Sequence, residues 1–472
     1  MIEGEDLADR PFLGLAALVV GVGAALRLVR LGAWSLWLDE GMTWQRATTG
    51  VLDDQGPLYV ATPLNYLLTR AVVVSLGDAP LWLRIVPAVF GVAGVAAVIW
   101  AGRRIGGPVC GLVAGAFVAL SPWHLQWSQN ARHFSAVFLF TTIAFGAAYA
   151  YLEEGRRRHL ITSALAGALG LAAHSSAAFV LVAIAGTAVW RLTPAGHARA
   201  GAHAHARARS RALRLAILLV GTGLAYAPVA LWISAYLAGS REAWNTPGNV
   251  LASIAYYIGP APLAIVALAA ATGARRGDPV LVAVGAWLAV PAALAVAAAS
   301  VTISSGAYAI ASLAAVAVGA GLVVAALAPV RVAAIGSAGG LLLAALVADQ
   351  ATRSVLYLTA EAGNRPPWHD AADWVGANVP AGAPVYSDAA VVLRYYLGPE
   401  RDLRWLDSWA PAERDAHWLV ILADAPARSS PAVRAHVGAD CALETVFRRS
   451  GGPKRRDVEV YRCAASVGEP AG

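Results

Sequence analysis

Two adjacent carboxylates, Asp39 and Glu40, lie in the segment Trp34-Ser35-Leu36-Trp37-Leu38-Asp39-Glu40-Gly41-Met42-Thr43-Trp44, directly after the first hydrophobic stretch. Acidic residues are otherwise sparse in the hydrophobic part of the chain. A positioned carboxylate is a common general base, able to take a proton from a reacting hydroxyl group. If the protein is a catalyst, we expect its chemistry at this pair.

The composition indicates the setting in which these carboxylates lie. Of 472 residues, 58% are hydrophobic and only 14% are charged, and the mean hydropathy is +0.58. These values are typical of a polytopic membrane protein and not of a soluble domain. The net charge of +7 does not indicate nucleic-acid binding, because the arginines cluster in short loops between apolar runs, where they set membrane orientation.

A membrane span needs about 20 mostly apolar residues. We predict about eleven transmembrane helices, at Pro11 to Leu28, Trp82 to Ala101, Pro108 to Trp123, Phe134 to Leu152, Leu160 to Ala173, Ser176 to Trp190, Leu215 to Tyr236, Val250 to Thr272, Pro279 to Ala299, Gly306 to Leu327 and Ala333 to Ala348. The arginine-rich loops then fall on one side, which the positive-inside rule makes cytoplasmic. The Arg199 to Arg211 stretch is expected to be a cytoplasmic linker.

The domain organisation follows from this topology. Residues 1–348 form a transmembrane domain with a large first outer loop at 29–81, and residues 349–472 form a small α/β domain outside the membrane. We place Val60 to Leu76 in that loop as an interfacial helix, because counting it as a span would put every later basic loop outside. The loop should hold two helices, one starting near Asp39 and one near Pro63.

The α/β domain is predicted from a change in composition and from alternating apolar runs. Its strands are expected at Ala383 to Tyr386, Trp418 to Ala423, Ala442 to Phe447 and Val458 to Tyr461, with helices near Asp370 to Ala377 and Ala389 to Leu397. Cys441 and Cys463 each adjoin a predicted strand, and we expect them to form a disulfide under the oxidising conditions outside the cell. Two buried free thiols are the alternative.

The remaining polar groups of the transmembrane domain gather at its outer surface. The turn Ser128-Gln129-Asn130-Ala131-Arg132-His133, His174 and Tyr308 all fall there, and no Asp, Glu, Lys or Arg lies near the middle of a predicted span. Ion-coupled transporters generally carry such groups at bilayer depth. The distribution favours a reaction on a lipid-linked substrate at the membrane surface over transport.

Several motifs in order resemble those of GT-C glycosyltransferases, in particular the group of protein O-mannosyltransferases and aminoarabinose transferases. They are Trp37-Leu38-Asp39-Glu40, Pro63-Leu64-Asn65-Tyr66-Leu67-Leu68, Leu83-Arg84, Ser128-Gln129-Asn130-Ala131-Arg132-His133-Phe134, His174 and the tail segment Pro367-Trp368-His369-Asp370-Ala371-Ala372-Asp373-Trp374-Val375. The sequence departs from the family pattern at Ala61-Thr62-Pro63, at His133-Phe134 and at Ala307-Tyr308.

The resemblance implies inverting transfer of a sugar from a polyprenyl-phosphate donor to a lipid, glycan or protein acceptor on the outer face of the plasma membrane. Asp39 matches the catalytic base, and Glu40 would orient it or contact the acceptor. Arg132 is the candidate for the donor phosphate, because a guanidinium binds phosphate in a bidentate manner, and His133 and Arg84 are further candidates. His174, Tyr66 and Tyr308 are candidate substrate contacts.

Several of these residues also have a purely structural interpretation. Asp39 is a good helix N-cap, the tryptophans at 34, 37 and 44 suit an interfacial belt, and Arg132 can snorkel to lipid headgroups. A transporter or lipid flippase and a catalytically inactive scaffold are the alternative functions. No metal-ligand spacing or cofactor motif occurs, a divalent cation is left open, and no nucleic-acid partner is expected.

Overall fold

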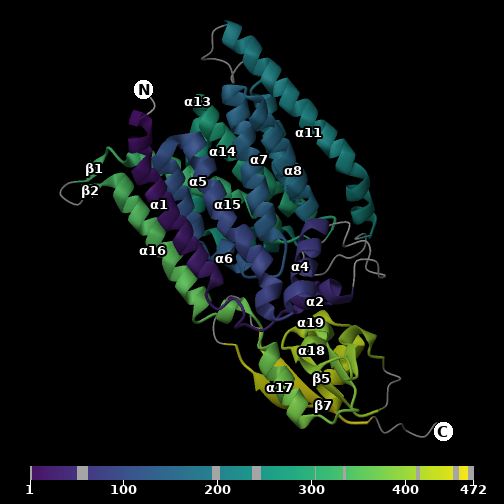
Figure 1. The fold of residues 1–472 in the computed structure, drawn as a ribbon. Coiled ribbons are helices and arrows are strands. Elements are labelled where there is room, and N and C mark those ends of the chain that lie inside the picture. Colours follow the sequence, from purple (N-terminus) through teal and green to yellow (C-terminus); the bar gives the residue numbers. More distant parts are fainter. Residues whose placement is uncertain are drawn as a thin grey trace. The chain divides into compact units, whose positions relative to one another are not determined.

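The computed structural model describes residues 3–49, 62–193, 202–236, 246–302, 304–332, 336–410, 415–449 and 456–465 (Figure 1). The described chain divides into two compact units. Unit 1 contains the described residues of 1–29, 51–69 and 84–354, and unit 2 contains those of 30–50, 70–83 and 355–472. Part of the predicted first loop, residues 50–61, lies outside the described residues.

Unit 1 is built of apolar helices. In chain order they are α1 (Glu3–Leu28), the first half of α4 (Pro63–Leu76), most of α5 (Pro80–Ala119), α6 (Pro122–Ser128), α7 (Phe134–Glu154), α8 (Arg157–Ala173), α9 (Ala177–Trp190), α11 (Ala202–Tyr236), α12 (Pro247–Ile258), α13 (Pro260–Arg276), α14 (Pro279–Ala298), η1 (Gly306–Ala309), α15 (Ala311–Leu327) and most of α16 (Ala338–Leu358). A short antiparallel hairpin, β1 (Arg331–Val332) and β2 (Gly336–Ser337), precedes α16.

Within this bundle α7 packs against α8 and α9, and α14 packs against α9, α13 and α15 (Figure 1). The two turns that carry the predicted site motifs of unit 1 lie at helix ends of this bundle. The Ser128 to His133 turn joins α6 to α7, and His174 follows the last residue of α8. The bundle therefore fixes both turns through the helices on either side of them.

Helix α5 is two helices joined at Gly107, which has φ +85° and ψ −178°. The chain folds back at this point and brings the backbones of the two helices close together. A Cβ on Gly111 would lie 2.6 Å from the Ile99 carbonyl oxygen, and one on Gly102 would lie 2.9 Å from the Gly111 Cα. Such approach of two helix backbones is available only to glycine. The break falls between the two predicted spans Trp82 to Ala101 and Pro108 to Trp123.

The predicted span Val250 to Thr272 is wrong as a single helix. The chain turns by 98° between α12 and α13, at Gly259 with φ +92° followed by Pro260. The proline supplies no backbone N–H for a continuing helix, and glycine alone takes such a φ without strain. Thr246 caps the first piece by accepting a hydrogen bond from the Asn249 backbone N–H.

The count of about eleven transmembrane helices is not confirmed. Among the described residues, and with α5 counted as one helix, six helices are long and apolar enough to cross a membrane, or up to seven if the bent pair α12 and α13 is one span. Helices α4, α9 and α15 are apolar but shorter, with 14, 14 and 17 residues. The length of α4 falls below the roughly 20 residues of a spanning helix, as does that of α9, and the interfacial placement of α4 stays a prediction.

Two further boundaries differ from expectation. Helix α16 continues to Leu358, ten residues past the predicted span end at Ala348, although it contains Asp349 and Arg353. Helix α11 begins at Ala202, so the described part of the Arg199 to Arg211 stretch is helical and not a plain linker. Alanine and arginine are both strong helix formers, and this local preference explains the helix in a stretch that we expected to be a linker.

Unit 2 contains a five-stranded mixed sheet in the order β4-β3-β5-β7-β6. Its strands are β3 (Val385–Ser387), β4 (Leu403–Trp405), β5 (His417–Leu422), β6 (Cys441–Phe447) and β7 (Val458–Cys463). Strand β3 runs parallel to β4 and β5, whereas β7 is antiparallel to β5 and β6. All four predicted strands are present, and β4 is an additional one that was too short to show a pattern.

The helices of unit 2 include α17 (Trp368–Asn378) and α18 (Ala390–Leu397), close to their predicted positions, with α19 (Ala425–Arg428) and α20 (Pro431–Asp440) in addition. Buried apolar side chains of the sheet, of the turn after β4 and of α19 and α20 form one core: Tyr386, Leu406, Leu419, Ile421, Ala425, Val433, Val437 and Cys463. Cys441 and Cys463 face each other in the register of β6 and β7 and form the predicted disulfide, with their Cα atoms 4.0 Å apart.

Candidate functional site

The predicted loop helix at the carboxylate pair is α2 (Leu38–Thr49), and it belongs to unit 2. It packs against α18 so closely that a Cβ on Gly41 would lie 2.9 Å from a Val392 methyl group. Asp39 is the second residue of the helix and not its N-cap, so the N-cap interpretation is wrong. A carboxylate in the first turn is nevertheless stabilised by the positive end of the helix dipole.

The two carboxylates lie in different environments. Glu40 is fully buried, and its Oε1 accepts a hydrogen bond from Arg365 Nη2 at 3.3 Å, with only 3% of the Arg365 side chain exposed. Asp39 is only partly buried. Burying a carboxylate is costly unless it is paired, and the Arg365 guanidinium supplies such a pairing for Glu40 inside unit 2.

Sequence reasoning missed Arg365. The only signal for it was its place two residues before Pro367, where the tail motif begins. The guanidinium also lies 5.7 Å from the centre of the Trp37 ring, which Arg456 approaches at 6.0 Å. Trp37 and Glu40 are thus held by cations from the C-terminal part of the same unit.

The other two tryptophans of the segment pack inside unit 2. Trp34 is 8% exposed and meets Tyr357 edge to face at 5.5 Å. Trp44 donates from Nε1 to Asp78 Oδ2 at 2.8 Å and meets Tyr395 at 5.2 Å. Trp34 is therefore a core residue rather than the lipid-facing anchor expected for an interfacial belt.

In unit 1, the turn that carries Arg132 is tied to the end of α1. The Gln129 side-chain amide donates to the carbonyl oxygens of Leu26, Arg27 and Val29 at 3.1, 3.2 and 2.8 Å. The first two carbonyls belong to the last turn of α1 and the third directly follows the helix, where helical partners run out. Gln129 therefore satisfies the helix end and fixes the position from which Arg132 projects.

Arg132 and Tyr66, both predicted site residues, are in contact. Arg132 Nη1 donates to the Tyr66 hydroxyl oxygen at 3.4 Å, and Tyr66 is 3% exposed. The third predicted cation, Arg84, is fully buried near the start of α5. The planar guanidinium has five N–H donors, whose geometry matches the oxygens of an anion such as a phosphate.

Three more predicted residues form an aromatic cluster beside this turn. The His133 and His174 rings stack with centroids 4.2 Å apart and planes at 5°, and Tyr308 lies 4.9 Å from His174. Phe134 contacts His133 at 4.3 Å. The structure thus brings together Arg132, His133, His174, Tyr66 and Tyr308, from four separate stretches of unit 1.

The hydrogen bonds of the cluster indicate what its imidazoles offer. His174 Nδ1 accepts the Ser176 backbone N–H at 3.1 Å, so its proton is on Nε2 in the neutral ring. His133 Nε2 is buried and has no hydrogen-bond partner among the described residues. Buried polar atoms are nearly always paired, so an unpaired one in this position suits a ligand.

Both histidines are neutral at physiological pH. Burial lowers the pKa of His133 well below its usual value, and the nearby His174 and Arg132 act in the same direction. Burial likewise lowers the pKa of His174 to about 3, with a further contribution from Arg132. The cluster therefore offers uncharged hydrogen-bonding rings, and the positive charge comes from Arg132.

Two kinds of solved structure share this fold over almost the whole length of this chain. The aminoarabinose transferase ArnT from Cupriavidus metallidurans in the apo state matches at a TM-score of 0.58 and 16% identity, covering 97% of this chain and 99% of that one. Its structure bound to undecaprenyl phosphate matches at 0.55 and 15% identity, with the same coverage of 97% and 99%.

A second similar structure is the archaeal oligosaccharyltransferase AglB from Archaeoglobus fulgidus in complex with an inhibitory peptide and a dolichol-phosphate. It has a TM-score of 0.59 at 11% identity and covers 98% of this chain and 75% of that chain. No family model and no curated protein matches the sequence. At these identities the similarity defines the fold, which is the GT-C fold that the sequence motifs predicted.

Proposed function

We propose that this protein is a membrane glycosyltransferase that moves a sugar from a polyprenyl-phosphate donor to an acceptor hydroxyl group with inversion at the anomeric carbon. The observation that carries the proposal is the assembly of Arg132, Tyr66, His133, His174 and Tyr308, all named from motifs, within a chain of GT-C fold. One of the ArnT structures with a similar fold has undecaprenyl phosphate bound. A polyprenyl phosphate of this kind is the carrier of the donor sugar in the reaction proposed here.

Asp39 is the proposed base. Inverting transfer needs one carboxylate that takes the acceptor proton as the oxygen attacks. Glu40 is engaged by Arg365, and a carboxylate oxygen that already accepts a hydrogen bond from a guanidinium is less available to take a proton from an acceptor. The division of roles therefore assigns proton transfer to the partly buried Asp39 and positioning of the start of α2 to Glu40.

Arg132 is proposed to bind the donor phosphate. The bond from the sugar to the phosphate oxygen breaks, and the polyprenyl phosphate leaves with an additional negative charge that a guanidinium stabilises. Tyr66 orients Arg132 through its hydroxyl group. The neutral His133 and His174 then act as hydrogen-bonding groups toward the donor or acceptor, with Tyr308 supporting His174, and Arg84 is a further candidate for the phosphate.

No step of this mechanism uses a metal. A divalent cation is left open as a cofactor, because such an ion can be held by a single carboxylate together with substrate phosphates, and Glu40 is engaged by Arg365. The reaction is derived from the carboxylate base and the guanidinium alone.

We further propose that the protein lies in the plasma membrane with α2, the Ser128 to His133 turn and unit 2 outside. Cysteine labelling tests this orientation with low background, because Cys110 is buried and the other two cysteines form the disulfide. An impermeant reagent should label Thr49→Cys and Ala427→Cys from outside intact cells. Labelling of only one of the two would contradict the orientation.

The function is tested by glycolipid and glycoprotein profiling of a deletion strain complemented with variants. Asp39→Asn keeps the size of the side chain and removes its basicity, so we expect the missing product to remain missing although the protein is made and folded. Asp373→Asn alters an exposed carboxylate of the same unit, 70% exposed, and should restore the product. Restoration by Asp39→Asn would contradict the base assignment, and an unchanged profile on deletion would favour a scaffold.

A further inference from the structure

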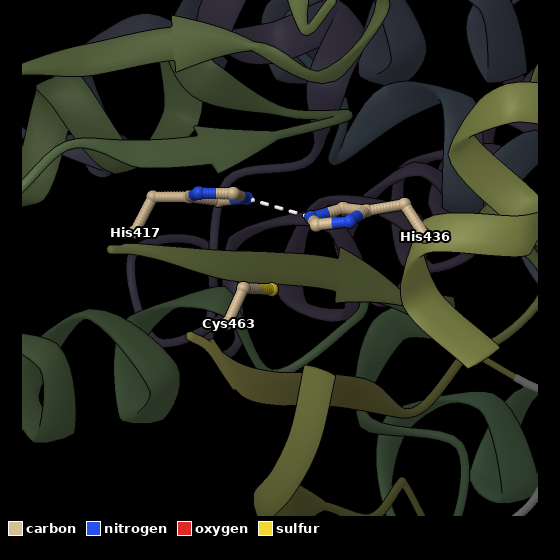
Figure 2. Close-up of side chains that lie close together, drawn as sticks. All are labelled: His417, His436 and Cys463. Carbon is tan, nitrogen blue, oxygen red and sulfur yellow. Dashed lines mark hydrogen bonds between the residues drawn. The ribbon is translucent and has the colours of Figure 1, made fainter. Parts of the chain in front are cut away.

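Two histidines of unit 2 that have no role in the proposed transfer reaction point their rings at each other (Figure 2). His417 begins β5, and His436 lies on α20. Their Nε2 atoms are 3.0 Å apart, and the Cys463 Sγ lies in the same group, whose ligand atoms are all within 4.8 Å of one another (Figure 2). His417 is 3% exposed, and the His436 side chain is 10% exposed.

The second nitrogen of each ring fixes where its proton lies. His417 Nδ1 is 2.9 Å from the Asp415 carbonyl oxygen, which can only accept, so this nitrogen carries hydrogen. His436 Nδ1 is 2.8 Å from Asp440 Oδ2, and a carboxylate likewise accepts. In two neutral rings, neither Nε2 then carries a proton, so the two Nε2 lone pairs face each other.

Such a contact needs a positive charge between the lone pairs. We propose that His417 and His436 bind one transition-metal ion of the kind imidazole prefers, such as Zn²⁺, through their Nε2 atoms. Two ligands at about 2.0–2.1 Å in a tetrahedral site are roughly 3.3 Å apart, close to the observed separation. This ion stands apart from the transfer reaction.

The surroundings have the pattern of a ligand support. Metal-bound histidines usually donate their other N–H to a carboxylate or a backbone carbonyl, and here Asp440 and the Asp415 carbonyl are those acceptors. Trp409 stacks on the His436 ring with ring centroids 4.2 Å apart, and Tyr386 meets His417 edge to face with ring centroids 5.3 Å apart. Both rings are thus fixed in orientation on the core of unit 2.

Cys463 does not supply a thiolate to this site. Its sulfur is bonded to Cys441, and a thiolate is the form of cysteine that binds metals. The proposal therefore rests on two protein ligands, with water in the remaining positions. Such a site should bind Zn²⁺ reversibly and more weakly than a closed four-ligand site.

Zinc stoichiometry of the full-length protein tests the proposal. The protein is purified in detergent with a tag that contains no histidine, stripped with a chelator, and dialysed against buffered Zn²⁺ before metal analysis. Wild type should bind one more equivalent than His417→Gln or His436→Gln. His369→Gln changes an exposed histidine of the same unit, 56% exposed, and should match wild type.

A variant that leaves both ligands in place guards against misfolding. Asp440→Asn alters a side chain that is 53% exposed and should weaken zinc binding about 10-fold or more, the usual effect of losing an outer carboxylate. Equal zinc content in wild type, His417→Gln and His436→Gln would overturn the proposal and assign the contact to a proton shared by the two rings. Unchanged affinity in Asp440→Asn would also count against it.

Discussion

Glu40 and Arg365 lie 325 residues apart in the sequence, yet Arg365 Nη2 approaches Glu40 Oε1 to 3.3 Å inside unit 2. One end of the pair is in the first turn of α2, and the other lies just before α17. The pair joins the carboxylate segment to the C-terminal part of the chain and places a cation beside a buried carboxylate.

Removing one partner should therefore be costly. We expect Arg365→Met to destabilise unit 2 by about 3–5 kcal/mol, because it leaves the Glu40 carboxylate buried without its cation. The double variant Arg365→Met with Glu40→Gln should recover much of this loss. Thermal unfolding of the full chain in detergent measures both, and equal destabilisation in the single and double variants would contradict the argument.

The phosphate role of Arg132 predicts different effects for two substitutions. Arg132→Lys keeps the charge but loses the planar fork, so donor binding should weaken by about 1–3 kcal/mol even though the charge remains. Tyr66→Phe removes only the hydroxyl contact and should have a smaller effect, near 1 kcal/mol. Titration with a polyprenyl phosphate measures both. Wild-type affinity in Arg132→Lys would mean that the residue does not bind phosphate in a bidentate manner.

The neutral histidine cluster makes stability depend on pH. The unfolded chain protonates His174 near its ordinary pKa of about 6.5, whereas the folded pKa is lowered to about 3 by burial and by Arg132. Between these values the unfolded state binds more protons, so stability must fall as the pH falls below about 6.5. His174→Gln should show a shallower decline. Unfolding midpoints at pH 7, 6 and 5 compare the two.

Asp388 gives the opposite dependence. Burial raises the pKa of Asp388 from 3.8 to about 6. The Leu422 backbone N–H and Arg428 favour the charged form and partly offset this rise. Between about pH 4 and pH 6 the folded state therefore holds a proton that the unfolded state has lost. The contribution of this proton to the free energy of unfolding disappears as the pH rises through about 6. Asp388→Asn should be as stable as wild type near pH 4. At pH 8 it should be more stable by about 1–3 kcal/mol, and a variant that is less stable at pH 8 would contradict this sign.

The disulfide closes a sequence separation of 22 residues between two paired strands. By the chain-entropy estimate, its loss should destabilise unit 2 by roughly 3 kcal/mol. The double variant Cys441→Ala with Cys463→Ala tests this by thermal unfolding. Cys110→Ala is not a suitable control, because Cys110 is buried in unit 1. The wild type treated with a thiol reductant serves instead, and its thermal stability should fall by a similar amount.

The sequence by itself determined the local properties of this protein. Hydrophobic runs located most apolar helices, since burial in lipid or in a bundle both require continuous apolar surface. Alternating patterns located β3, β5, β6 and β7, and the ordered motifs identified the GT-C fold and the members of the cluster around Arg132 and His174. These features depend on residues that are neighbours in the chain or repeat with a fixed period.

Only the tertiary structure decided which distant groups meet. Hydropathy could not show the 98° break at Gly259, because the apolar run continues across it. The Glu40 to Arg365 pair and the His417 to His436 contact likewise have no periodic signal, since each joins residues on separate elements. The physical reason is that pairing of charges and lone pairs depends on distance in space, whereas a sequence pattern records only distance along the chain.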